Sequence, residues 1–242
     1  MKSNIIKVFC LAALMLTVGT ASQAQFRHFR QSIYLNGAIP TGQFSGAVTA
    51  DAITGSHVPL TRTDAGKGAA FGFGAGYRAS YRFDIGMGEV SPFLSGDFFF
   101  NMIKSDLRDE YATAYMDAPM YFNIPILAGI SYNYDELNTR FPIIPFGEFG
   151  VGADIFMITS EGANNNTFSY KPSTTVAWMV GAGVYLGNYV SVGAYYYGLG
   201  KHPIDYTQKT LDNNAVAALQ NTTMERQLRN LGTLAIRVGF HL

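Results

Sequence analysis

Hydrophobic and polar side chains alternate with a period of two residues in eight segments of this chain, and most of these segments contain 11 to 17 residues. Strands of soluble proteins usually have about five or six residues, whereas a tilted strand that crosses a bilayer needs about 9–11. The length and the periodicity together predict membrane-spanning strands. The segments are Ser32–Ile39, Ala69–Phe83, Val90–Met102, Met120–Tyr132, Phe141–Met157, Thr174–Leu186, Tyr189–Leu199 and Gly232–Leu242.

Formal charges are sorted to one side of these segments. In the last segment, for example, Leu234, Ile236, Val238, Phe240 and Leu242 share one face, and Arg237 lies on the other. An Arg or Lys that faces lipid near the bilayer midplane costs about 2–4 kcal/mol, whereas charges inside a closed barrel can pair. All six formal charges of the eight segments lie on the polar face: Arg78, Arg82, Arg237, Asp97, Glu148 and Asp154.

A soluble ligand-binding barrel would have the opposite arrangement, with apolar side chains inside. The sequence therefore predicts an all-β fold, namely an eight-stranded antiparallel transmembrane up-and-down β-barrel. Two prolines, Pro125 and Pro145, fall inside predicted strands and remove ladder donors, so we expect each to mark a bulge or a position near the rim.

The connections between the segments alternate in length. Short links of this kind face the periplasm in outer-membrane barrels, and long loops face the outside. This pattern predicts that both chain ends lie on the periplasmic side. The short links are Asp84–Glu89, Asn133–Arg140 and Gly187–Asn188, and the long ones are 40–68, 103–119, 158–173 and 200–231.

The first 24 residues have the features of a secretory signal peptide. Lys2 and Lys7 precede an apolar stretch, Val8–Thr20, and the small residues Ser22 and Ala24 after this stretch form a cleavage site. We therefore expect residues 1–24 to be removed near Ala24 after export through the Sec pathway, and residues 25–242 to form the barrel. Only 14% of the residues are charged, fewer than the roughly 25% of a soluble domain. The formal net charge of zero gives no reason to expect nucleic acid as a partner.

With its strands placed, the chain resembles the outer-membrane β-barrel domain family, the small OmpA/OmpX-like barrels of Gram-negative bacteria. The residues that carry the resemblance are 37–42, 122–129, 145–152 and 237–242. It implies a location in the cell outer membrane, contact with lipid and lipopolysaccharide, and insertion by the barrel-assembly machinery. That machinery recognises a C-terminal strand ending in an aromatic residue, whereas here Leu242 is last and Phe240 lies two positions before it.

Strand direction and approximate register put four of the inward charges near mid-depth: Arg78, Asp97, Glu148 and Arg237. We expect them to form a structural ionic cluster in the lumen, in which removal of one partner costs about 3–5 kcal/mol. The glycine-rich runs 72–76 and 181–183 are followed by no predicted helix, so we interpret them as space for large inward side chains rather than as nucleotide-binding loops.

Outward aromatic residues are expected to form interfacial belts. These residues are Tyr81, Phe83 and Tyr132 on the periplasmic side, and Phe98, Phe100, Trp178 and Tyr196 on the outer side. In the longest loop, the composition of Asn213–Asn230 is compatible with a short helix.

Three functions remain open at this point. The first is a structural or surface-interaction role through the external loops, with an unknown extracellular ligand. The alternatives are a narrow channel and a rim-located enzyme that modifies lipid A. His57 and His202 fall in predicted external loops, with Asp205 close to His202, but no serine has a recognisable triad spacing and no histidines have metal-ligand spacing. We therefore expect no enzyme activity, no catalytic, cofactor-binding or metal-binding residue, and no cofactor.

Overall fold

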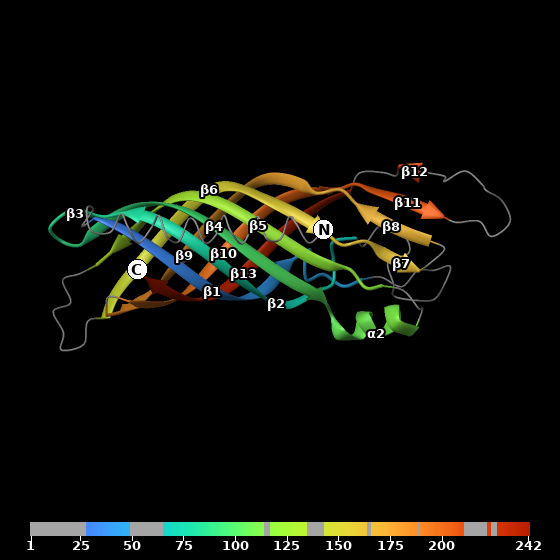
Figure 1. Ribbon diagram of the computed structural model, residues 1–242, viewed down its shortest axis with the longest axis horizontal. Coiled ribbons are helices and arrows are strands. Elements are labelled where there is room, and N and C mark those ends of the chain that lie inside the picture. The colour runs from blue at the N-terminus through green and yellow to red at the C-terminus, as the bar shows by residue number, and fades with distance from the viewer. Residues whose placement is uncertain are drawn as a thin grey trace, which may run out of the picture.

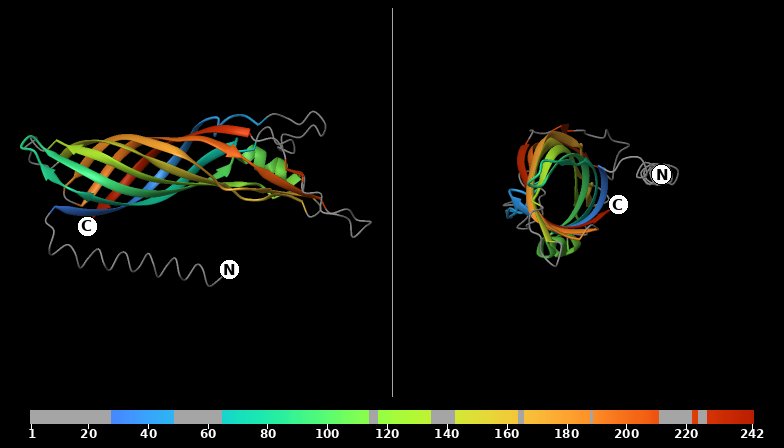
Figure 2. Two further views of the ribbon diagram at one scale, coloured as in Figure 1. Left: turned by 90° about the horizontal axis from the view of Figure 1, so that it is seen from above. Right: turned by 90° about the vertical axis from the view of Figure 1, so that its left-hand side faces the viewer.

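Eight long strands close into one antiparallel barrel, shown in side view in Figure 1 and along its axis in Figure 2. The computed structural model describes residues 28–48, 65–113, 117–134, 143–163, 166–187, 189–210, 222–223 and 227–242. The barrel strands are β1 (Phe29–Gly42), β2 (Ala69–Tyr81), β4 (Glu89–Ile103), β5 (Met120–Asn133), β6 (Ile143–Ile158), β9 (Ser173–Leu186), β10 (Val190–Ile204) and β13 (Gln227–His241). Each strand pairs with its neighbours along the chain, and β13 pairs with β1 to close the ring. The predicted fold class is confirmed, whereas the predicted signal peptide lies outside the described residues.

Further elements lie at the two ends of the barrel. At the end with short connections, β3 (Phe83–Asp84) pairs with the start of β4. At the other end, the external end, the helix α2 (Ser105–Thr113) buries Leu107 and Tyr111. A small sheet of β7 (Glu161–Ala163), β8 (Asn166–Tyr170), β11 (Tyr206–Thr210) and β12 (Thr222–Thr223) also lies at the external end (Figure 1).

Three predictions about the long connections were wrong in part. The sequence predicts no helix at Ser105–Thr113, and it predicts that the β10 segment ends at Leu199, five residues before the observed end at Ile204. Within Asn213–Asn230, where a helix was expected, Thr222–Thr223 and the residues from Gln227 onward are strand. The rest of that segment lies outside the described residues.

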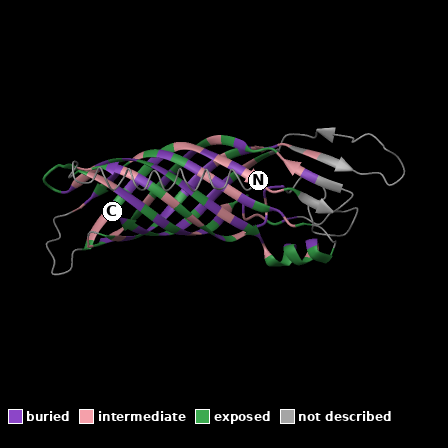
Figure 3. Ribbon diagram, in the orientation of Figure 1, coloured by how far each residue is buried: buried purple, intermediate pink, exposed green. Residues whose placement is uncertain are grey.

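Buried and exposed residues alternate along the barrel strands, as the checkered colouring of Figure 3 shows. In β13, Ala235 and Arg237 are buried, whereas Leu234, Ile236 and Val238 on the other face are exposed. Large apolar side chains are exposed all around the outward face, whereas water-soluble monomers rarely expose contiguous apolar patches beyond a few hundred Å², so this face fits a surface covered by lipid. The chain is an outer-membrane type of β-barrel.

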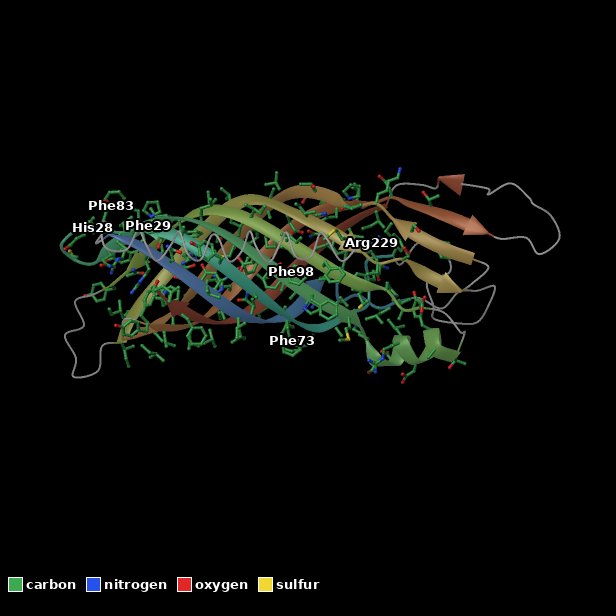
Figure 4. All side chains as sticks on the ribbon, in the orientation of Figure 1. His28, Phe29, Phe73, Phe83, Phe98 and Arg229 are labelled. Carbon is green, nitrogen blue, oxygen red and sulfur yellow. The ribbon has the colours of Figure 1, made fainter. Side chains whose placement is uncertain are left out.

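All seven residues predicted for the aromatic belts lie on this outward face or are partly exposed there. Phe73, labelled in Figure 4, likewise points away from the wall. Among the described residues, no helix is both long enough and apolar enough to span a bilayer.

Proline affects the ladder without shifting its register. In the β5–β6 ladder, Pro125 pairs with Asp154 without any shift of register. In the β4–β5 ladder, two residue pairs at Pro125 are missing, and the pairing then resumes in the same register. Of the two alternatives expected for Pro125, a bulge or a position near the rim, the bulge is therefore wrong, because the missing donor leaves only a gap in the ladder. Pro145 lies two residues after the start of β6, near the rim, and its register is also continuous.

The register shifts occur at small residues instead. One lies between Gly198 and Gly200 of β10, and another between Ala69 and Gly72 of β2. Gly200 has a φ of 87°, a conformation that glycine adopts without strain, so a bulge is possible there. Inward glycine also makes room for large side chains, since a Cβ on Gly181 would lie 2.1 Å from the Tyr195 ring.

Candidate functional sites in the lumen

Two ion pairs occupy the middle of the lumen. The four residues expected there, Arg78, Asp97, Glu148 and Arg237, are all buried, with 1–5% of each residue exposed. They form two ion pairs, and the guanidinium carbons of Arg78 and Arg237 lie 5.6 and 4.0 Å from the centroid of the same Tyr34 ring. Arg78 donates to both carboxylate oxygens of Glu148, and Arg237 Nη2 lies 2.8 Å from Asp97 Oδ1. Both are charge-assisted contacts, and the two-fold contact of Arg78 with Glu148 is the stronger geometry.

Arg237 also contacts polar and aromatic groups from two further strands, β1 and β10. Its Nε donates to Asn36 Oδ1 at 3.0 Å, and its Nη2 also donates to the Tyr197 hydroxyl, which in turn donates to Asp97. The guanidinium carbon lies 4.0 Å from the centroid of the Tyr34 ring and 4.2 Å from that of Tyr195. The faces of these two aromatic rings stabilise the desolvated guanidinium cation of Arg237.

The same layer fills the barrel. Tyr34, Phe99, Tyr197 and Arg237 are each at most 1% exposed, and the Phe99 and Tyr197 rings pack edge to face at 5.0 Å. A water-filled path through this layer would expose the side chains that line it. The mid-depth layer is therefore closed in this conformation, as expected for a barrel of eight strands.

A second polar group, which the sequence pattern does not predict, lies closer to the external end. His202 Nδ1 is 2.9 Å from the Ser173 hydroxyl oxygen, and His202 Nε2 is 3.0 Å from Asp154 Oδ2. Nε2 also lies 2.8 Å from the Leu199 carbonyl oxygen. Ser173, His202 and Asp154 are all buried, with exposed fractions of 8%, 0% and 0%. Nε2 faces two acceptors, the Leu199 carbonyl and Asp154, so Nε2 is the nitrogen placed to donate, and Nδ1 can then accept from the Ser173 hydroxyl.

The expected position of His202 in an external loop was wrong, and its carboxylate partner is Asp154 rather than Asp205. His202 belongs to β10 and points into the lumen because the bulge at Gly198–Gly200 changes which side of the strand faces inward. A strict period of two continued past Leu199 places His202 on the outward side. The two flanking glycines were the signal that could have indicated the bulge.

The other titratable side chains have different partners. Arg82 forms an ion pair with Glu89 at 3.3 Å near the short-turn end. His241 lies between the hydroxyl groups of Ser32 and Ser191, at 2.7 and 2.8 Å. His57 lies outside the described residues. Within the described ranges, no three His, Cys, Asp or Glu side chains lie close enough together to hold a metal ion.

Comparison with solved structures finds other outer-membrane proteins. The chain is similar to the neisserial surface protein NspA, with 14% identity, a TM-score of 0.43 and coverage of 88% of this chain and 96% of that one. OprG of Pseudomonas aeruginosa has 14% identity and a TM-score of 0.44, covering 88% and 95%. A major outer-membrane protein of Thermus thermophilus has 10% identity and a TM-score of 0.45, covering 88% and 99%. No protein-family model and no curated protein sequence matches the chain.

Proposed function

We propose that this protein is a closed, non-enzymatic outer-membrane barrel that acts through its external surface. The observation that carries the proposal is the mid-depth layer around Arg237, in which aromatic rings and ion pairs leave the inward side chains almost without exposed area. A plugged lumen supports a role for the external end, where α2 and the sheet of β7, β8, β11 and β12 extend beyond the barrel wall. Loops on a rigid scaffold are the usual carriers of binding specificity.

The environment of this surface follows from the same proposal. The outward band contacts membrane lipid, the external end contacts lipopolysaccharide, and the barrel-assembly machinery inserts the chain after Sec export. The identity of an extracellular ligand depends on the loops, whose chemistry the barrel does not determine.

Two measurements test the proposed surface role. Purified protein in planar bilayers should show no discrete conductance steps, because the layer at Arg237 is closed. Protease added to intact cells should cleave the external connections and leave a barrel that still shifts in electrophoretic mobility on boiling. Steady single-channel steps from the folded protein support the channel alternative and contradict the proposal.

A second candidate function is hydrolysis of an acyl ester at the external rim, and the contact of Ser173, His202 and Asp154 favours it. In a Ser-His-Asp triad the serine contacts Nε2 and the carboxylate contacts Nδ1. Here the two ring nitrogens are exchanged, and all three side chains are buried. Hydrolysis at this position therefore requires the external mouth to open.

A serine-directed fluorophosphonate probe distinguishes the two functions. Labelling of the folded protein that is lost in Ser173→Ala, together with a mass change in lipid A after expression, supports the hydrolase. We expect no labelling and unchanged lipid A, because the Ser173 hydroxyl is inaccessible.

A further inference from the structure

The turn that follows β1 folds into the external mouth of the barrel. Gly42 ends β1 with a φ of 63°, a left-handed conformation that glycine adopts without strain, and the turn follows directly. Phe44 lies between the exposed Gln43 and the half-buried Ser45, yet none of its own surface is exposed. Side chains of a connecting turn usually face solvent, so the burial of Phe44 indicates that its ring packs into the mouth.

The Phe44 side chain reaches the opposite wall of the barrel. Its ring packs edge to face against Tyr121 of β5 and Phe156 of β6, with centroid distances of 5.5 and 5.9 Å. Both partners are inward side chains with at most 2% of their surface exposed. In the closed barrel, β6 lies four strands from β1 in either direction, so Phe44 spans the mouth (Figure 2).

Hydrogen bonds hold the segment 43–48, which we call the cap, in this position. The Ala69 N–H group donates to the Phe44 carbonyl oxygen at 3.0 Å. Lys104, directly before α2, donates from Nζ to the Ser45 carbonyl oxygen at 2.7 Å. Such bonds contribute modestly where water competes for the same groups, so the buried Phe44 ring supplies much of the stability of the closed cap.

Phe156 connects the cap to the group at His202. The Phe156 ring centroid lies 5.3 Å from that of His202, and Ser173 is the ladder partner of Phe156 between β6 and β9. Ser173 is the first residue of β9, at the external rim, and is still only 8% exposed. The rings of Phe44, Phe156 and His202 therefore form a continuous row from the mouth to the Ser173 hydroxyl.

An unpartnered amide lies beside this row. Asn123 of β5 has Phe99 and Phe156 as its ladder partners on its two sides, so it lies between the mid-depth layer and the cap. It is fully buried, and neither atom of its side-chain amide has a hydrogen-bond partner among the described residues. Buried polar groups are nearly always hydrogen-bonded, directly or through water. Asn123 therefore offers unused hydrogen-bonding capacity to a small polar molecule that passes the cap.

We propose that the cap is a gate, with Phe44 as its plug, that admits small polar molecules from outside to a compartment formed by Asn123 and the group at His202. In the closed position the aromatic cluster excludes water from the Ser173 hydroxyl. In the open position that hydroxyl and the Asn123 amide are accessible, while the mid-depth layer around Arg237 stays closed. The gate goes beyond the proposed surface role and concerns access alone, so it does not depend on hydrolysis of an ester.

Thiol labelling of the full folded chain in octyl glucoside tests the gate. Cys10, the only cysteine of the sequence, is replaced by Ser, and Ser173→Cys then places a single thiol in the compartment. The rate of its reaction with a charged methanethiosulfonate reagent is compared with that of Lys171→Cys, an exposed position just before β9. Ser173→Cys should react at least about a hundredfold more slowly, because a buried thiol reacts only in the open fraction of the molecules.

Three variants test the role of the plug. Phe44→Ala should speed the labelling of Ser173→Cys by about tenfold or more, since loss of a buried aromatic ring favours the open cap. Lys104→Met, which removes one hydrogen bond to the cap, should speed it by a smaller factor. Phe98→Ala, which removes an outward ring of β4, is the matched control and should leave the rate unchanged.

A second thiol distinguishes opening of the gate from loosening of the whole barrel. Ala235→Cys lies two residues from Arg237 on the inward face, at a fully buried position, and should react no faster in Phe44→Ala than with the cap intact. Each variant is compared only after its mobility shift on boiling shows a folded barrel. The proposal is wrong if Phe44→Ala labels Ser173→Cys no faster than Phe98→Ala does, or if it speeds Ala235→Cys by the same factor.

Discussion

The inward and outward faces of the barrel wall are built from the same strands but obey opposite rules. In β13, Arg237 is 1% exposed and contacts Asp97, Asn36 and Tyr197, whereas Ile236, one residue away, is 49% exposed. Successive side chains therefore face two different environments, a packed polar lumen and the hydrocarbon of the bilayer. The comparison teaches that a substitution should be judged by which face it lies on, and the following predictions test that rule in order of expected effect.

The largest effect is expected for Arg237→Ala on the inward face. Removal of one partner leaves Asp97 buried without its cation, so the free energy of unfolding should fall by about 3–5 kcal/mol. Urea titration of the protein folded in lipid vesicles measures this loss. Arg108→Ala on the exposed side of α2 is the control and should change little.

A double replacement separates the loss of pairing from the loss of packing. Arg237→Met with Asp97→Leu removes both charges, so we expect it to be much less destabilising than Arg237→Ala alone. If both variants unfold at the same urea concentration as the unmodified protein, the ion pair has no structural role.

Val180→Arg places a charge on the outward face near the middle of β9. This change should cost about 2–4 kcal/mol in the same titration, because the guanidinium faces lipid. Val180→Leu keeps the face apolar and should be nearly neutral. An equal stability of Val180→Arg and Val180→Leu indicates that this face does not contact hydrocarbon.

Gly152 and Gly147 of β6 provide a matched comparison of steric crowding, for which we expect a smaller change in the free energy of unfolding. A Cβ on Gly152 would lie 2.0 Å from the Ile126 carbonyl oxygen, whereas a Cβ on Gly147 has no atom within 4 Å. We therefore expect Gly152→Ala to cost about 1–3 kcal/mol and Gly147→Ala to be close to neutral. Similar unfolding curves for the two variants contradict the packing described for the wall.

The smallest effect is expected for Asp154→Asn. Asp154 Oδ2 lies 3.0 Å from His202 Nε2, but Nε2 also lies 2.8 Å from the Leu199 carbonyl oxygen, so the carboxylate is one of two acceptors for this ring nitrogen. Removing the charge should change the free energy of unfolding by less than about 1 kcal/mol, since the burial cost of a carboxylate is removed together with its attraction to the ring. Asp97→Asn, measured in parallel, should cost clearly more.

The barrel itself could be predicted from the sequence because its two faces differ chemically at every second residue. The sorting of Arg78, Asp97, Glu148 and Arg237 to the polar side was visible without coordinates, since the period of a strand is fixed. Their division into two pairs was not visible, because it depends on the cross-barrel distances that bring Arg78 to Glu148 and Arg237 to Asp97.

A strict period of two misses the group at His202 for a different reason. One bulge between Gly198 and Gly200 reverses the inward side of β10, and a period of two cannot anticipate an extra residue. The contact of Phe44 with Phe156 likewise requires closure of the barrel, which places β6 opposite β1. Sequence periodicity therefore predicts the wall better than it predicts what the wall encloses.

The most direct test of the account is a spin-label scan from Leu234 to Phe240 in β13, in protein folded into lipid vesicles. Collision with oxygen, which concentrates in lipid, and with a water-soluble nickel complex should be measured at each position. The account predicts that labels at Leu234, Ile236, Val238 and Phe240 meet oxygen, whereas those at Ala235 and Gly239 meet neither reagent strongly. A profile without this period of two, or one in which every position meets the nickel complex, contradicts it.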